Sequence, residues 1–412
     1  MNSSVRFGIF SLILLSILFI RFYFFYSNQP QYIDGQQVAL TAMLFSEPQL
    51  IGSQQVIYAN LASGQKVRIM TTRFPEFHYG DSVRISGTLK VKLLTNNSVI
   101  YSMYFPEIEL IESSGGAMEE GLAVISNIRQ KLISLFSQTL SSPSSSLLMG
   151  IIFGIKEKMP EEFTENLRTS GVFHVIAASG MNVTLIGGFI SSFFALFIKR
   201  QFALALSVLG IVFYAVLGGM EASIIRASIM GILVFSAQIM GRQTLAAVGL
   251  FLAGFLMLFV SPVLIFDIGF QLSFAATLGI LYIKPLFGNK LGFTSEILTT
   301  VAAQVATLPI LLANFGSYSV YSILVNGLVL WTVPILMVIG GVGALIGLVI
   351  TPLGKLIIYF CYPLLLYFES IVNFFGKIGG IIFIQTLPWQ IVVGYYFLLS
   401  SVLLIFRRKN AT

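Results

Sequence analysis

The chain has 412 residues, of which 56% are hydrophobic and 10% are charged. Soluble globular proteins are about 25% charged, so this composition excludes a water-soluble surface over most of the chain. The formal net charge of +7 is too dilute for a protein that coats nucleic acid. The single cysteine, Cys361, excludes an intramolecular disulfide, and two histidines far apart in sequence argue against a histidine-based metal centre.

The first apolar segment covers residues 7–26 and follows Arg6. It ends in Arg21 and a run of aromatic residues, a composition typical of a membrane–water interface. A secretory signal peptide would instead end in small residues at a cleavage site. We therefore expect residues 1–26 to be an uncleaved membrane anchor, with a cleaved signal peptide as the alternative.

Residues 27–120 alternate between apolar and polar side chains with a period of two, and turn-forming residues separate the runs. This pattern predicts a small all-β domain, and an OB-like barrel is the preferred fold. Gly87 falls inside the fourth strand and suits a bulge or a tight bend at a barrel corner. The predicted strands are residues 37–45, 54–60, 66–70, 82–92 and 105–111.

Residues 121–168 are expected to form amphipathic or interfacial helices. An amphipathic helix is predicted over 122–140. The apolar run 147–155 is too short to cross a bilayer and is expected to lie in the interface. A charged loop is predicted at 156–168.

From residue 169 onward nearly all of the chain is apolar enough to lie in a membrane, which predicts a transmembrane domain at 169–412. The run 320–350 is too long for one straight helix and contains Pro334 and Gly340-Gly341, so a broken or re-entrant helix is expected. With the anchor, the fold class is a polytopic α-helical membrane protein of about ten spanning helices with a small β domain. The other predicted spans lie near 172–198, 202–219, 222–240, 244–260, 264–283, 295–314, 320–350, 355–375 and 390–406.

Basic residues provide an independent test of this count, because cytoplasmic loops are enriched in Lys and Arg. With a cytoplasmic N-terminus, most basic loops and the tail Arg407–Lys409 fall inside, and Lys377 falls outside. The β domain is then extracytoplasmic.

Polar side chains within spans are costly and usually line a cavity. Asp267 and Gln271 share one helix face, Arg226 is expected to pair with Asp267, and a Ser179-Gly180 step suggests a helix break. On the predicted topology most of this set lies in the outer half of the bilayer, as a polar vestibule; structural helix–helix pairs are the alternative for each residue. The predicted cavity residues are His174, Ser179, Gly180, Asn182, Glu221, Arg226, Asp267, Gln271, Gln304, Asn314 and Asn326.

An intramembrane hydrolase using His174 and Ser179 is a weaker interpretation. Five residues apart on a continuous helix, the two side chains would point about 140° away from each other. Phosphate-binding glycine loops and Cys/His metal clusters are absent from the sequence, so we expect no enzyme activity, no cofactor and no metal.

Four ordered blocks between residues 172 and 330 resemble the ComEC-type competence proteins. The first carries a His-hydrophobic-x-Ala-x-Ser-Gly signature and the second a Ser-x-x-Arg-Ala pattern. The resemblance covers the membrane core well and the β domain loosely. The blocks are Phe173–Val183, Glu221–Ala227, Ser261–Phe274, and Gln304–Pro309 with Asn314-Phe315-Gly316.

The resemblance implies a channel for single-stranded DNA across the bacterial cytoplasmic membrane during natural transformation. It also implies a DNA receptor, a cytoplasmic helicase and a separate nuclease as partners. Many family members carry a C-terminal metallo-β-lactamase-like domain; this sequence ends at Thr412 after its last span, so nuclease activity is not expected. A transporter of another polar solute is the alternative.

An OB-like outer domain suits strand binding through aromatic stacking and phosphate contacts. A barrel-core or loop role is the alternative for each candidate residue, and His78 belongs to the same segment. The candidates are Lys66, Arg68, Arg73, Phe74, Phe77, Tyr79 and Arg84.

Overall fold

The chain forms two compact units in the computed structural model, residues 1–130 with 252–265 and residues 131–251 with 266–412. Each unit is described by itself. The described residues are 3–28, 30, 32–44, 48–51, 54–61, 64–78, 80–93, 99–111, 117–155, 159–176, 180–241, 245–287, 295–383 and 387–409.

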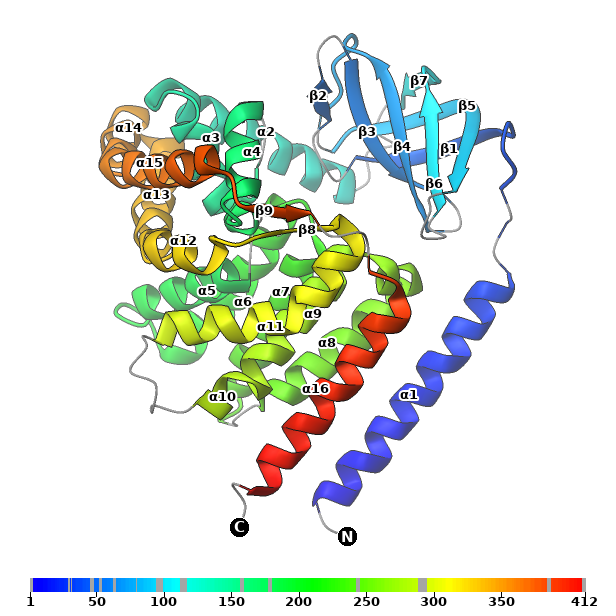
Figure 1. The fold of residues 1–412 in the computed structure, drawn as a ribbon. Helices are drawn as coiled ribbons and strands as arrows, with labels where there is room; N and C mark the ends of the chain where they lie inside the picture. The colour runs from blue at the N-terminus through cyan, green and yellow to red at the C-terminus, as the bar shows by residue number, and fades with distance from the viewer. Residues whose placement is uncertain are drawn as a thin grey trace. The chain divides into compact units, whose positions relative to one another are not determined.

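Helix α1 (Ser3–Ser27) opens the first unit and is drawn in blue in Figure 1. Residues Gly8–Ser27 are long and apolar enough to cross a membrane, and none of this window is buried in protein. The Arg21 Nε donates to the carbonyl of Phe259 at 3.2 Å, which ties the end of α1 to α8 (Ala246–Val260). An apolar helix without a protein-covered face is what the predicted anchor requires.

The β domain is one seven-stranded sheet in the order β1-β5-β6-β4-β3-β2, with β7 paired to β5. The β4–β6 pair is parallel and the other pairs are antiparallel. All five predicted strands are present, and the structure adds β2 and β6. The strands are β1 (Gln37–Met43), β2 (Gln49–Ile51), β3 (Gln54–Asn60), β4 (Lys66–Thr72), β5 (Ser82–Leu93), β6 (Val99–Tyr104) and β7 (Glu107–Leu110).

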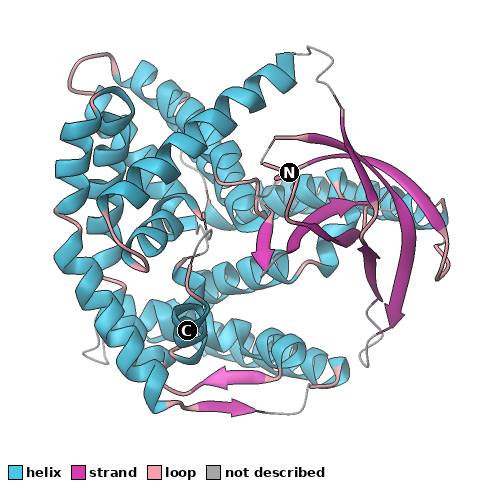
Figure 2. Cartoon of the chain, turned by 90° about the horizontal axis from the view of Figure 1, so that it is seen from above, coloured by secondary structure: helices cyan, strands magenta, loops and turns pink. Residues whose placement is uncertain are grey.

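Strand β5 explains why the sheet curves, as the magenta strands in Figure 2 show. Its first half pairs with β1 and β7, whereas residues 89–93 pair with β6. Gly87 stands at this change of partner, and a Cβ there would lie 2.7 Å from the Cβ of Pro106. The register with β1 runs through Gly87 without a bulge, so of the two expected roles only the bend stays a prediction.

The second unit is helical, with one short strand pair, β8 (Ser317–Ser319) and β9 (Ile381–Phe383). The helices belonging to it wholly or in part are α2 (Ala117–Thr139), α3 (Ser144–Phe153), α4 (Glu161–Thr169), η1 (Phe173–Val175), α5 (Gly180–Phe194), α6 (Arg200–Leu217), α7 (Ala222–Ile239), α8, η2 (Pro262–Phe266), α9 (Ile268–Tyr282), α10 (Lys284–Phe287), α11 (Ser295–Phe315), α12 (Ser322–Val329), α13 (Thr332–Val349), α14 (Thr351–Tyr359), α15 (Tyr362–Ile378) and α16 (Trp389–Lys409).

Six helices in the described residues are long and apolar enough to cross a membrane, or seven if α14 and α15 form one span broken by 45°. Shorter apolar helices are also present, such as α8, which lies in a predicted span. The chain therefore has the helices of a membrane protein, and the number of ten spans stays a prediction.

The predicted break in 320–350 is confirmed, but its position differs. The chain breaks at Leu330-Trp331, between α12 and α13. Pro334 lies in the first turn of α13, where a missing N–H is tolerated. Gly340 lies inside α13 and lets it approach α3, since a Cβ there would lie 2.5 Å from Ile152.

Helix α3 corrects the expectation of an interfacial segment at 147–155. Every one of its ten residues is buried, from Ser144 to Phe153. Helices α13 and α15 pack against it. A short apolar run that cannot span a bilayer can also form a buried core helix, and this is what α3 does. The predicted loop at 156–168 likewise contains a helix, α4.

Candidate functional site

Polar side chains from neighbouring helices bind both ends of the buried helix α3. The last carbonyls of a helix have no partner within the helix, and in a membrane protein they need another donor. The side chain of Asn182 donates to the Ile151 carbonyl at 2.7 Å, and the Tyr214 hydroxyl donates to the Ile152 carbonyl at 2.9 Å. Asn182, a predicted cavity residue, therefore closes the end of a core helix together with Tyr214, which the sequence did not single out.

At the other end of α3, the Ser144 hydroxyl donates to the carboxyl group of Glu369 on α15. Both side chains are buried. The N-terminus of a helix carries partial positive charge, so a carboxyl group is favoured there. The sequence analysis missed Glu369 and Ser144 because 225 residues separate them, and only a scan for acidic residues in apolar segments would have found Glu369.

Arg226, on α7, lies nearly buried, with 8% of its surface exposed. Its Nη1 donates to the Ser273 carbonyl and the Thr277 hydroxyl, both on α9. The predicted partner Asp267 instead precedes α9 and accepts the Phe270 N–H at 3.0 Å. Arg226 therefore contacts the helix that Asp267 precedes, but about two to three turns further along it than predicted.

Gly180 is brought together with Arg226. A Cβ on Gly180 would lie 2.7 Å from Nη2 of Arg226 and 3.4 Å from the Cβ of Ala227. Helices α5 and α7 can therefore approach this closely because residue 180 has no side chain. Ser179, the other half of the predicted step, lies outside the described residues.

Gln304 belongs to a third polar group, between α11 and α12. Its Nε2 donates to the Ser322 hydroxyl at 2.8 Å, and its Oε1 accepts from the Tyr318 hydroxyl at 2.8 Å. Burial raises the pKa of the Tyr318 hydroxyl, which keeps it protonated as the donor. Asn326 is buried and donates to Ser322 at 3.3 Å, so two predicted residues share one serine.

This group also fixes the loop after α4. The Ser319 hydroxyl donates to the Thr169 carbonyl at 2.6 Å, and Ser322 donates to the Gly171 carbonyl at 3.3 Å. Gly171 has a φ of 78°, a left-handed conformation that favours glycine. The polar residues here hold irregular backbone inside the bundle, as protein-covered loops require.

The remaining predicted cavity residues are not brought into one group by the contacts of the described residues. His174, in η1, is exposed. Asn314 is exposed and donates to the Ile310 carbonyl of its own helix at 2.8 Å. Glu221 precedes α7, and Gln271 lies half-buried in α9. The predicted cavity residues thus form separate local groups. Two of these groups, Asn182 with the end of α3 and Gly180 with Arg226, meet at the start of α5.

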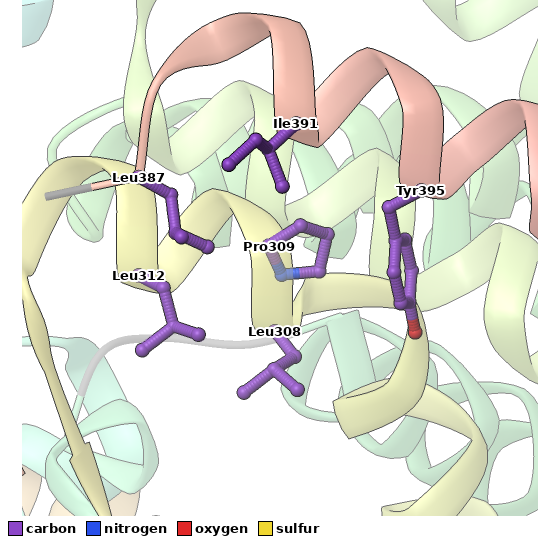
Figure 3. Close-up of a pocket in the computed structure, with 6 residues that line it drawn as sticks. All are labelled: Leu308, Pro309, Leu312, Leu387, Ile391 and Tyr395. Atoms are coloured by element: carbon purple, nitrogen blue, oxygen red, sulfur yellow. The ribbon is translucent and has the colours of Figure 1, made fainter. Parts of the chain in front are cut away.

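A small cavity of about 70 Å³ lies between α11 and α16, as Figure 3 shows. Pro309, inside α11, cannot donate to the Val305 carbonyl, and the Tyr395 hydroxyl of α16 donates to it at 2.8 Å instead. The lining is apolar apart from this tyrosine, and none of the predicted cavity residues contributes to it. We regard the cavity as a gap in packing beside a proline. It is lined by Leu308, Pro309, Leu312, Leu387, Ile391 and Tyr395.

The exposed face of the β domain carries a row of polar residues across four strands. Tyr58 on β3 lies opposite Arg68 on β4, Arg68 opposite Ser102 on β6, and Ser102 opposite Lys90 on β5. The Lys90 Nζ lies 5.4 Å from the ring centroid of Tyr104. Tyr58 and Tyr104 are 40% and 52% exposed, so the row offers aromatic faces beside two cations.

The residues predicted to bind DNA lie in different parts of the β domain. Lys66 and Arg68 are exposed on β4, next to buried Val67 and Ile69. Phe74 is exposed in a loop, where Arg73 forms an ion pair with Glu76 at 3.4 Å.

Phe77 corrects the prediction, since it is buried in the sheet core and cannot stack on a base. Arg84 is exposed but lies opposite Glu109, away from the row. Tyr79 lies outside the described residues. The sequence analysis missed Tyr58, Lys90 and Tyr104, and the signal that it lacked was the pairing between strands.

Comparison with known proteins agrees with this architecture. A sequence model of the family described as "Competence protein" matches residues 151–409, more than half of the chain. ComE operon protein 3 of Bacillus subtilis (strain 168) is 26% identical over 202 residues, which cover 48% of this chain and 26% of that protein. An uncharacterized protein of Aquifex aeolicus (strain VF5) is 26% identical over 267 residues, which cover 64% of this chain and 60% of that protein.

The chain thus spans about a quarter and about three fifths of the lengths of these two relatives. No solved structure matches it. The family match covers α4 to α16 and with them the polar groups around Asn182, Arg226 and Gln304. The chain therefore belongs to the competence protein family.

Proposed function

We propose that this chain conducts single-stranded DNA across the bacterial cytoplasmic membrane during natural transformation. The observation that carries the proposal is the family match over the helical bundle, supported by the similarity to ComE operon protein 3. The family supports a role in competence, and the channel is our proposal for that role.

The β domain supports the proposal through its exposed row. A single strand offers a phosphate at every nucleotide and bases whose faces stack on aromatic side chains. Arg68 and Lys90 supply cations, and Tyr58 and Tyr104 supply aromatic faces on the same side of the sheet. We propose that this face, with Lys66, receives the strand, and that the sheet is an OB-like half-barrel.

We further propose ten spanning segments, with both termini in the cytoplasm and the β domain outside. Short helices such as α8 and α9, together with broken segments such as α12–α13, would supply the spans beyond the long helices. A DNA receptor, a cytoplasmic helicase and a separate nuclease would act with the chain, which is itself proposed to lack enzyme activity.

Purified full-length protein in sealed vesicles tests the function. Fluorescent single-stranded DNA is added outside, with a DNA-binding dye trapped inside, and duplex DNA of the same sequence serves as the control. We expect protein-dependent entry of the single strand and exclusion of the duplex. Entry of small anions or sugars at the same rate as DNA would favour a transporter of another polar solute.

A further inference from the structure

Arg226 is the starting point because part of its hydrogen-bonding capacity is unused. A guanidinium has donors on two edges, and the Nη1 edge is taken by Ser273 and Thr277 of α9. The Nε is fully buried and has no hydrogen-bond partner among the described residues. Nε and Nη2 together form the side edge of the guanidinium, a planar pair of donors that suits a bidentate oxygen ligand.

The charge of Arg226 is also uncompensated. An arginine side chain stays protonated in proteins. Within the described ranges it forms no ion pair with an Asp or Glu, and both acceptors on α9 are neutral groups. A buried charge that lacks a counterion is strongly unfavourable, and in spanning helices such residues usually mark the path of an ion or substrate.

The start of α5 adds a second source of positive potential at the same point. Gly180 is the first described residue of α5, a helix described over 15 residues. The first N–H groups of a helix have no partner within it, and the positive end of the helix dipole favours an anion. Nη2 lies 2.7 Å from the position of a Cβ on Gly180, so the guanidinium faces this turn directly.

We propose that Arg226 and the first turn of α5 hold a phosphate group of the moving strand. The inference rests on the proposed function and locates within it one point where the bundle contacts the DNA backbone. A phosphate offers several oxygens, enough for the side edge of Arg226 and for helix N–H groups at once. The missing side chain of Gly180 lets Nη2 come this close to the turn.

The first test measures the thermal unfolding of the full-length protein in a phosphate-free detergent. Sodium phosphate is compared with sodium chloride at equal ionic strength. Arg226→Gln removes the charge, whereas Gly180→Ala keeps the charge but pushes the guanidinium away from the turn, because the added Cβ would lie 2.7 Å from Nη2. Gly188→Ala is the matched control on the same helix, because nothing lies within 4 Å of a Cβ there.

We expect phosphate to raise the unfolding temperature of the wild type and of Gly188→Ala but not of the other two variants. Added phosphatidylglycerol and a short oligo(dT) separate the sources of phosphate. A shift with oligo(dT) that is larger in the wild type than in Arg226→Gln supports the strand. A shift with the lipid alone overturns that assignment, and no shift with any of the three overturns the site.

The vesicle assay separates this inference from the function itself. Gly180→Ala should slow DNA entry by about tenfold or more, the effect of losing a charge-assisted hydrogen bond, while Gly188→Ala should conduct as the wild type. If the wild type conducts and Gly180→Ala conducts equally fast, the site is wrong and the channel stands. If the wild type does not conduct but phosphate still stabilises it, the site stands and the channel is wrong.

Discussion

The β domain and the helical bundle use polar side chains in different ways. In the β domain, the side chains of Arg68 and Lys90 point away from the apolar core. The pairing between the strands uses backbone atoms and does not depend on these side chains. In the bundle, Asn182 and Gln304 bind backbone or other side chains inside the protein. A polar residue on the sheet face is therefore not needed to complete the fold, whereas in the bundle it is first a means of satisfying buried polar groups.

Arg226 is the exception in the bundle that this comparison brings out. Asn182 closes α3, and Gln304 has partners for both of its amide atoms. Arg226 uses one edge of its guanidinium to join α7 to α9 and keeps a charge that no described carboxylate balances. The unused edge, rather than the presence of a polar residue, is what indicates a ligand.

The largest expected effect concerns backbone contact in the bundle. A Cβ on Gly354 would collide with the backbone of Gly347, where α13 and α14 meet. Gly354→Ala should lower the free energy of unfolding by about 3 kcal/mol or reduce membrane insertion, since backbone cannot move aside as a side chain does. Thermal unfolding measures this, and Gly341→Ala, which meets nothing within 4 Å, should be close to neutral. Equal losses in both would contradict the packing.

The next effect tests the role of Asn182 at the end of α3. Asn182→Leu leaves the Ile151 carbonyl buried without this donor and should cost about 2 kcal/mol of stability. Asn314→Leu serves as the control, because that exposed side chain binds only its own helix. A stable Asn182→Leu protein that no longer conducts DNA would show that Asn182 acts in the path rather than in the fold.

The third effect tests the sheet face without disturbing stability. The double variant Arg68→Ala/Lys90→Ala in the full-length protein should weaken binding of oligo(dT) by about tenfold at moderate salt. The dependence of log K on log salt should also become shallower by about 0.7 for each phosphate that no longer meets a cation. Arg73→Ala, in the loop paired with Glu76, should change both quantities less. An unchanged salt dependence in the double variant would rule this face out.

The smallest effect lies beside Pro309. Tyr395→Phe removes the donor to the Val305 carbonyl and should cost about 0.6 kcal/mol, the average for side-chain hydrogen bonds in membrane bundles. Tyr359→Phe, at an exposed position of α14, should leave the unfolding temperature unchanged. A clear gain in stability for Tyr395→Phe would show that the carbonyl has another partner.

The pattern of the sequence was enough for the elements whose signal is local. The alternation of Val67 and Ile69 with exposed residues gives strand β4, and a glycine within a strand singles out Gly87, next to which β5 changes its partner. Strand β6 was missed, although Tyr101 and Met103 are more buried than Ser102 and Tyr104, and although it pairs antiparallel with its neighbour β5 as well as parallel with β4. Local period alone does not show such pairing.

The contacts of the bundle could not be read in the same way. Hydropathy shows that Arg226 lies in an apolar helix, but the rotation of that helix decides whether it meets Asp267 or Thr277. The burial of α3 depends on α13 and α15, which lie about 200 residues away in the chain. Apolar length alone cannot distinguish a buried helix from an interfacial one.

The most direct test of the account is to stop a strand during passage and ask which residues it touches. A single strand carrying a bulky protein at one end is allowed to enter vesicles, and a photo-crosslinking residue replaces Met181 or Val349. Met181 lies in the first turn of α5, whereas Val349 is the strongly exposed last residue of α13. We predict crosslinks to DNA from position 181 and none from 349. Labelling from 349 alone would contradict passage along α5, and so would labelling from neither position while a third variant, with the crosslinker in place of Tyr58, still labels DNA.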